Sequence, residues 1–257
     1  MTMSKRTSLH NHFRSVLFIG GAFLSSCASI YMPPVPNTPM LTTQGEVAAG
    51  AHISLKGNFN FNSAYAVTDH FAVMANGAFL DNEGKKKDTK NKGLEFGGGF
   101  FNTFGKDNNR IIEIYGGLGS GRSERTVREF DDNDNLLSTD FREAGYTKQF
   151  LQVNYSSKKK KDLKLFGKTF GLNYGTALRV SFVQTKNFEQ NGIRQVNEDN
   201  IFFEPVFFTR MILSDQFQLQ YTSGSNIGLK SRKFLNAGHS VFSIGAVVNV
   251  GRAPKKK

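Results

Sequence analysis

The chain offers few side chains for covalent or metal chemistry, and its single cysteine, Cys27, is the first of them. One thiol cannot build a disulfide framework or a CxxC metal site. The five histidines are scattered, with no HExxH motif and no ligand spacing. Gly167-Lys168-Thr169 matches the end of a phosphate-binding loop, but Asp162 stands where that loop needs its first glycine. We therefore expect no metal, no cofactor and no enzyme.

The residues before Cys27 indicate that its sulfur is modified. Residues 1–15 carry three basic side chains and no acid, and the run from Val16 to Leu24 is apolar. This run is too short to span a bilayer but fits the apolar core of a secretory signal peptide. The next four residues, Leu24-Ser25-Ser26-Cys27, resemble the lipobox of bacterial lipoproteins.

That resemblance implies cleavage before Cys27, a diacylglycerol on its sulfur and an acyl chain, such as palmitate, on its new amine. Position 28 is Ala rather than the Asp that tends to hold such proteins in the inner membrane, so the resemblance implies the outer membrane. Lipidation would also remove an unpaired thiol from an oxidising compartment. The alternative is an incidental Cys27 behind an ordinary signal peptide.

A second group of chemically capable side chains is expected on the polar face of alternating strands. It contains Glu95, Glu113, Lys148, Arg179, Glu204 and Arg210. Three groups of each sign indicate a paired network that fills a narrow lumen, because an unpaired buried charge costs several kcal/mol. We interpret the network as a structural ion-pair core rather than a catalytic or conducting one. Phe101, Phe150, Phe202 and Phe208 are expected to share this lumen.

These side chains need strands to position them, and period-two alternation of apolar and polar residues runs from Glu46 almost to the end of the chain. The alternation predicts an all-β fold of about ten strands, with eight or twelve left open. The expected ranges are about 46–56, 58–67, 70–80, 94–105, 111–121, 145–156, 168–184, 200–213, 216–222 and 240–250. Most of them reach the roughly 9–11 residues that a tilted strand needs to cross a bilayer.

Short and long connections mostly alternate along the chain. This alternation is typical of an antiparallel, up-and-down transmembrane β-barrel with short periplasmic turns and long outer loops. An even strand count predicts that both chain termini lie on the periplasmic side. The expected organisation is a lipoprotein signal peptide (1–26), a proline-rich extended tether (27–45), the barrel (46–251) and a basic tail (252–257).

The segment from Ala64 to Gly77 carries a family resemblance. An aromatic strand end, a Thr68-Asp69 turn and a glycine-containing return strand resemble small bacterial outer-membrane barrels of the porin-like, OmpA-like superfamily. The chain departs from many such barrels because it ends in a basic tail rather than an aromatic residue. It also has no Trp, so an aromatic girdle would have to use Tyr and Phe.

The formal net charge of +12 indicates anionic partners. Lys85, Lys86 and Lys87 are expected on an outer loop, where lipopolysaccharide phosphates lie, and the lysines between 158 and 164 on the periplasmic side near anionic head groups. Outer-membrane lipids are thus the expected partners, and an envelope protein is the alternative partner. The compartment disfavours nucleic acid.

The leading functional hypothesis is a non-enzymatic outer-membrane β-barrel lipoprotein with a structural or interaction role and a lumen plugged by polar and aromatic side chains. A narrow passive, porin-like channel is the main alternative. An outer-membrane enzyme with its site at the barrel rim and a soluble, lipocalin-like lipid carrier, whose faces would be inverted, are the others.

The lipid anchor is directly testable. Replacement of Cys27 by Ala should abolish metabolic labelling with a palmitate analogue and leave the leader uncleaved, because the lipoprotein peptidase acts on the modified cysteine. Absence of label from the wild-type protein would contradict the lipobox interpretation.

Overall fold

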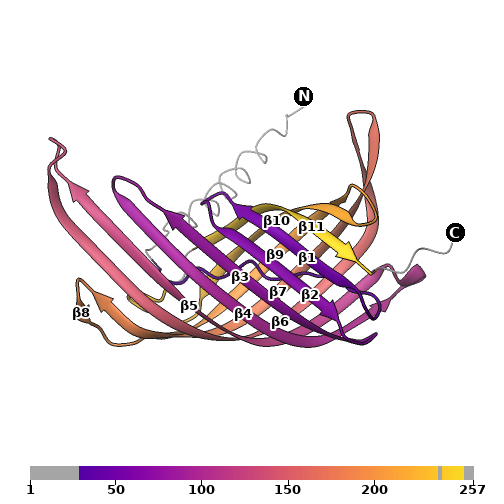
Figure 1. Ribbon diagram of the computed structural model, residues 1–257, viewed down its shortest axis with the longest axis horizontal. Coiled ribbons are helices and arrows are strands. Elements are labelled where there is room, and N and C mark those ends of the chain that lie inside the picture. The colour runs from indigo at the N-terminus through magenta and orange to yellow at the C-terminus, as the bar shows by residue number, and fades with distance from the viewer. Residues whose placement is uncertain (1–28, 237–238, 252–257) are drawn as a thin grey trace, which may run out of the picture.

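The computed structural model describes residues 29–236 and 239–251, and most of these residues lie in strands (Figure 1). The strands are β1 (Val47–Ser54), β2 (Phe59–Ala66), β3 (Phe71–Asn82), β4 (Lys87–Phe104), β5 (Arg110–Phe130), β6 (Leu136–Leu165), β7 (Lys168–Gln190), β8 (Ile193–Arg194), β9 (Asp199–Ile212), β10 (Phe217–Gly228) and β11 (His239–Val250). A 3-10 turn, η1 (Lys106–Asn108), lies between β4 and β5. No helix in the described ranges is long and apolar enough to cross a membrane.

Ten of these strands form one closed antiparallel barrel. Each pairs with its neighbour along the chain, with β7 pairing to β9 and the two-residue β8 only extending the edge of β7. Strand β1 pairs with β2 on one side and with β11 on the other, from Val47 opposite Val250 to Ser54 opposite Ser243. Closure leaves no long unpaired edge to attract another chain. The predicted fold class and the count of ten barrel strands are confirmed.

The two faces of the sheet divide by polarity, because successive side chains of a strand point to opposite faces. Outward-facing apolar side chains are widely exposed, as Phe96 (63%), Leu118 (64%) and Phe207 (61%) illustrate. Inward-facing positions are buried and largely polar. An exposed apolar belt around a polar interior suits a barrel with lipid outside. The inverted faces of a lipocalin-like carrier are not observed.

Several strands run further than the alternation predicted. Much of the predicted loops 81–93, 122–143 and 185–198 is paired strand, and so is most of the connection at 157–167. Backbone pairing continues in these hairpins beyond the apolar belt, where polar and charged side chains interrupt the regular alternation of apolar and polar residues. The apolar signal therefore ends before the hydrogen-bonded ladder does.

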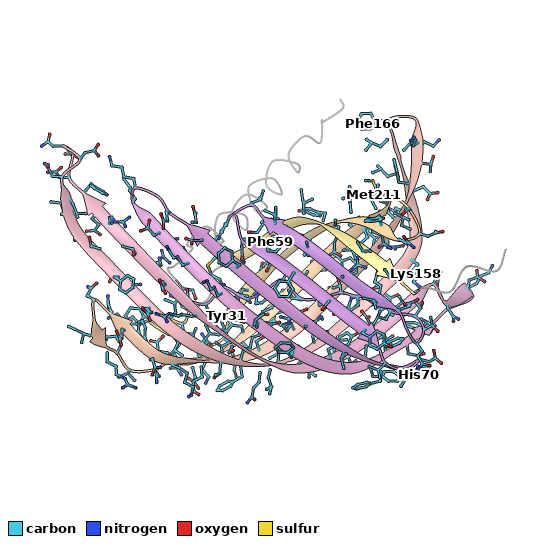
Figure 2. All side chains as sticks on the ribbon, viewed as in Figure 1. Tyr31, Phe59, His70, Lys158, Phe166 and Met211 are labelled. Carbon is cyan, nitrogen blue, oxygen red and sulfur yellow. The ribbon has the colours of Figure 1, made fainter. Side chains whose placement is uncertain are left out.

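The barrel has two distinct ends. At one end, called here the turn rim, short turns at 67–70, 105–109 and 213–216 join the strands. His70 and Lys158 mark this rim on the right of Figure 2. The opposite end, the loop rim, carries the extended hairpins β3–β4 and β5–β6 and the connection from β7 to β9. The β6–β7 hairpin breaks the pattern, because it projects well beyond the other connections at the turn rim.

The outward apolar belt predicts that a charged side chain on this face lowers the free energy of unfolding markedly. Leu178 is 45% exposed on the outer face of β7, between its paired neighbours on β6 and β9. Replacement of Leu178 by Arg should cost about 2–4 kcal/mol in folding into lipid, as at the midplane of other barrels. Urea titration of folding in vesicles would measure the cost.

The matched control is Thr139→Arg, at an exposed position on the part of β6 beyond the belt. It should fold like the wild type. Equal stability of the two variants would show that Leu178 does not face lipid.

Candidate functional site in the barrel lumen

The lumen contains the chain's own N-terminal segment. Residues 29–41 are all buried, without forming a strand or helix. This segment, the lumen segment, runs inside the barrel beneath the strands in Figure 1. An extended chain from residue 29 to residue 45 reaches about 50 Å at about 3.1 Å per residue, more than the roughly 25 Å height of an apolar belt. The sequence predicted the extension of this segment but not its enclosure.

An aromatic cluster near the loop rim holds the start of the lumen segment. The amide of Ile30 donates to the carbonyl of Phe234, 3.3 Å away. The ring of Tyr31 packs edge-on against Tyr146, with centroids 5.3 Å apart, and tilted against Phe202 at 4.6 Å. Such ring pairs contribute stability beyond that of the area they bury, and they fix the orientation of the side chain.

The middle of the lumen segment is matched to the barrel by hydrogen-bond chemistry. Four prolines, at positions 33, 34, 36 and 39, remove backbone donors and leave carbonyls that need partners. The facing side chains supply donors: Asn91 to Met32 at 3.1 Å, Asn62 to Val35 at 3.3 Å, Gln152 and Asn154 to Asn37 at 2.6 and 3.1 Å, and Arg210 to Pro39 at 3.3 Å. Amide and guanidinium side chains in the lumen thus complement a segment of acceptors.

The residues that follow the lumen segment are held at the turn rim. The Gln44 amide and the Thr43 hydroxyl both donate to a carboxylate oxygen of Asp69, at 2.8 and 3.1 Å. These hydrogen bonds hold the pKa of Asp69 below its ordinary value, because they favour the ionised carboxylate. Asp69 lies in the β2–β3 turn, so the chain crosses from one rim to the other.

This crossing sets where the two ends of the described part of the chain lie. The start of β1 and the end of β11 do lie together at the turn rim, where Val47 pairs with Val250. Ser29, however, lies beside the loop-rim cluster. The two ends of the described chain are therefore at opposite rims, and the even strand count could not reveal it, because that count concerns only the strands.

Four of the six predicted ionisable residues form one buried network. Lys148 Nζ lies 2.7 Å from Glu95 Oε1 and 3.5 Å from Glu204 Oε2. Arg179 Nη1 lies 3.0 Å from Glu95 Oε2 and 3.8 Å from Glu204 Oε2. The four side chains are at most 3% exposed and their formal charges cancel. Neutrality and mutual contact offset the large cost of removing charges from water.

A glycine makes the contact across β5 possible. Gly119 stands opposite Glu95 of β4 on one side and Lys148 of β6 on the other. A Cβ at Gly119 would lie 2.9 Å from Cγ of Glu95. The missing side chain lets the carboxylate reach the ammonium group two strands away.

The network also contacts the lumen segment and the inward-facing rings. The Tyr31 hydroxyl donates to Glu204 Oε1 at 3.0 Å. Arg179 lies 4.6 Å from the centroid of the Phe150 ring, and Lys148 lies 5.5 Å from that of Tyr31. Contacts between a cation and a ring face are favourable, more so when both are desolvated. Tyr31 is therefore part of the same polar core as the four charged residues.

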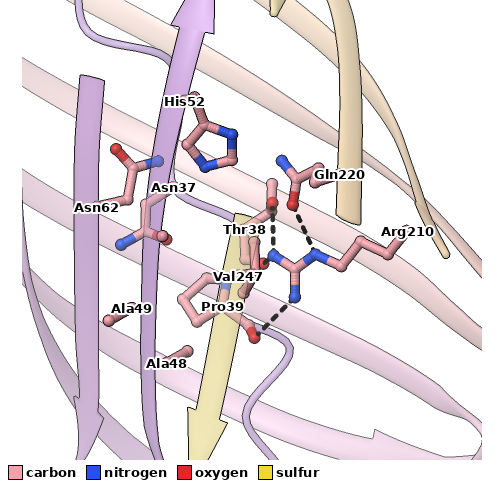
Figure 3. A pocket seen from close by; sticks show the side chains of 11 residues that line it. Asn37, Thr38, Pro39, Ala48, Ala49, His52, Asn62, Arg210, Gln220 and Val247 are labelled. Atoms are coloured by element: carbon pink, nitrogen blue, oxygen red, sulfur yellow. Dashed lines mark hydrogen bonds between the residues drawn. The ribbon is translucent and has the colours of Figure 1, made fainter. Parts of the chain in front are cut away.

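The other two predicted residues, Glu113 and Arg210, hold the lumen segment. Glu113 accepts from the Leu41 amide at 3.3 Å and from Asn154 at 3.0 Å. Arg210 donates to the carbonyls of Thr38 and Pro39 and, at 2.6 Å, to Gln220 (Figure 3). The cavity beside these contacts has a volume of only about 10 Å³, near the lower limit for a single water.

The structure thus places all six predicted lumen residues inside the barrel, together with Phe101, Phe150, Phe202 and Phe208. Cys27 lies outside the described residues. Lys85, Lys86 and Lys87 lie at the loop rim, where Lys85 pairs with Asp134 at 2.7 Å. In the described ranges no group of three or more His, Cys, Asp and Glu side chains could hold a metal.

Sequence reasoning missed the polar and aromatic contacts of the lumen segment, above all those of Tyr31 and Asn37. One signal was present: residues 28–45 contain no charged side chain, although they include Ile, Tyr, Val, Leu and two Met. Solvent-exposed linkers are usually polar or charged. An uncharged, partly apolar linker next to a polar barrel indicates burial.

Comparison with known proteins agrees with the architecture. The solved translocator domain of the autotransporter NalP from Neisseria meningitidis is similar, with a TM-score of 0.51 and 10% identity, over 93% of this chain and 96% of that one. The structure of the FpvAI–pyocin S2 complex gives a TM-score of only 0.23 at 10% identity, over 84% and 42% of the two chains, and carries no argument. No protein-family model and no curated protein sequence matches the chain. At this identity the likeness shows the fold alone, which is that of an outer-membrane β-barrel.

Proposed function

We propose that this chain is a non-enzymatic outer-membrane β-barrel lipoprotein with a structural or interaction role, and that its own lumen segment closes the barrel. The observation that carries the proposal is the unbroken burial of residues 29–41 along the lumen, from the loop-rim cluster to the contact of Leu41 with Glu113. Buried donors of the barrel hold this segment along its length. A passive channel needs a continuous aqueous path, which this arrangement opposes.

The orientation of the barrel belongs to the same proposal. Long loops of bacterial barrels lie outside and short turns face the periplasm, so the loop rim is the outer one. Ser29 then lies at the outer end of the lumen. The lysines at the loop rim, Lys85 to Lys87, would face lipopolysaccharide phosphates.

The conductance of the purified protein in planar bilayers tests closure. The wild type should show at most rare, small openings. Replacement of residues 30–41 by a Gly/Ser sequence of equal length should produce sustained current, because the replacement lacks the prolines, the Tyr31 ring and the fitted carbonyls. A double variant, Glu204→Ala with Arg210→Ala, removes one anchor for Tyr31 and one for Thr38 and Pro39, and should raise conductance while destabilising the fold.

A Gly/Ser replacement of residues 131–135, in the β5–β6 turn of the loop rim, is the matched control and should leave conductance unchanged. Heat-modifiable migration on gels would show that each variant is folded. A steady ohmic current through the wild type would replace our proposal with the channel alternative. A folded 30–41 variant that stays silent would show that the lumen segment is not what closes the barrel.

Insertion of an epitope tag tests orientation. A tag between Asp132 and Asn133, at the loop rim, should bind antibody on intact cells. A tag in η1 (Lys106–Asn108), at the turn rim, should bind only after permeabilisation. The reverse result would show the opposite orientation of the barrel, with Ser29 at the periplasmic end.

A further inference from the structure

The β6–β7 hairpin at the turn rim has a composition that the other turns of that rim lack. Its outer part, residues 161–172, pairs from Lys161 opposite Leu172 to Leu165 opposite Lys168. Residues 161–169 are all exposed. Phe166 at the tip is 94% exposed, and it and Gly167 form the turn with positive φ values of 48° and 73°. Figure 2 shows Phe166 well apart from the rest of the rim.

The register makes this hairpin amphipathic, because directly opposed residues share a face. One face carries Leu163 opposite Phe170, with Leu165 and Leu172 on either side. The other face carries Lys164 opposite Thr169 and Asp162 opposite Gly171. Lys161 and Lys168 lie at the two ends of the apolar face, opposite Leu172 and Leu165, and Phe166 stands at the tip.

An isolated two-stranded ribbon is only marginally stable in water. Leu163 and Leu165 are each 40% exposed here. On the same face Phe170 is half-buried and Leu172 is buried, so the outer end of the face is its exposed part. A protruding ribbon gains stability if a further surface covers that exposed part.

The apolar face continues the lipid-facing surface of the barrel. Side chains two apart on a strand share a face, so on β7 the register of Leu178 continues through the half-buried Tyr174 and the buried Leu172 to the half-buried Phe170. The register between β6 and β7 shifts between Ser157 and Lys161, which interrupts the regular ladder where the hairpin leaves the barrel. Bulges bend a strand and increase its twist, and in Figure 1 the hairpin turns away steeply from the rest of the rim.

The charges around the apolar face favour an anionic surface. The outer hairpin carries three cations, Lys161, Lys164 and Lys168, and a single acid, Asp162. Long lysine side chains can keep their ammonium groups at lipid phosphates while their stems lie along apolar surface. Each cation near an anionic membrane surface contributes attraction.

We propose that this hairpin is a membrane-interface foot: its apolar face and Phe166 enter the boundary between head groups and acyl chains of the leaflet at the turn rim, and its lysines bind lipid phosphates. The inference rests on the proposed placement of the barrel in a membrane. It adds a second lipid contact that lies outside the transmembrane belt.

The absence of Trp from the chain makes the test specific, because any Trp introduced is the only one present. Phe166→Trp would be reconstituted as the full-length protein into vesicles of phosphatidylethanolamine and phosphatidylglycerol with brominated acyl chains. Its emission should be blue-shifted and lose most of its intensity relative to vesicles without bromine. Loss of the anionic lipid, or the triple replacement of Lys161, Lys164 and Lys168 by Glu, should weaken the quenching.

Two further single-Trp variants separate failure of this inference from failure of the proposed function. Phe207→Trp lies on the lipid-facing belt and should be strongly quenched, and Val196→Trp, 86% exposed at the loop rim, should not be. An unquenched Phe207→Trp would show that the barrel itself is not in the bilayer. A quenched Phe207→Trp beside an unquenched, water-like Phe166→Trp would overturn the foot alone and leave a protein as the occupant of the apolar face.

Discussion

Asn, Gln and Arg side chains of the barrel donate hydrogen bonds to the carbonyls of the lumen segment, and the filling of the lumen depends on these bonds. These side chains and the segment are buried, and a buried polar group without a partner is costly. A proline-rich segment presents mostly acceptors, and the inward face of this barrel is rich in donors. Either component alone would leave a set of buried groups without partners.

The charged network holds several strands to one another and to the lumen segment. Glu95, Lys148, Arg179 and Glu204 come from β4, β6, β7 and β9. Loss of one member would leave a buried charge without its partner, which typically costs about 3–5 kcal/mol. Tyr31 ties the lumen segment to this network through Glu204. The lumen is therefore a polar core, while the apolar surface faces outward.

Enclosure of the lumen segment constrains how the barrel assembles. The segment leads directly into β1, and β1 forms the closing seam with β11, the last strand of the chain. Once that seam has formed, the segment can enter only by threading through a rim. Contacts with β2, through Asn60 and Asn62, are local in sequence and can form before closure. Contacts with β9 bridge more than 170 residues and need a nearly complete barrel.

The sequence by itself determined the strand alternation, a count of about ten barrel strands and which side chains face inward. It placed Glu95, Glu113, Lys148, Arg179, Glu204 and Arg210 in the lumen, because the period of two is a local property of each strand. It did not decide which of these charges meet, since Gly119 opens the path between Glu95 and Lys148 only when three strands lie side by side. Nor did it decide how far the hairpins extend past the belt, because backbone pairing needs no apolar pattern. The tertiary structure alone placed residues 29–41 inside the barrel. An extended segment without regular structure has no repeat of apolar and polar residues from which its buried side could be predicted, and its position follows from contacts with strands distant in sequence.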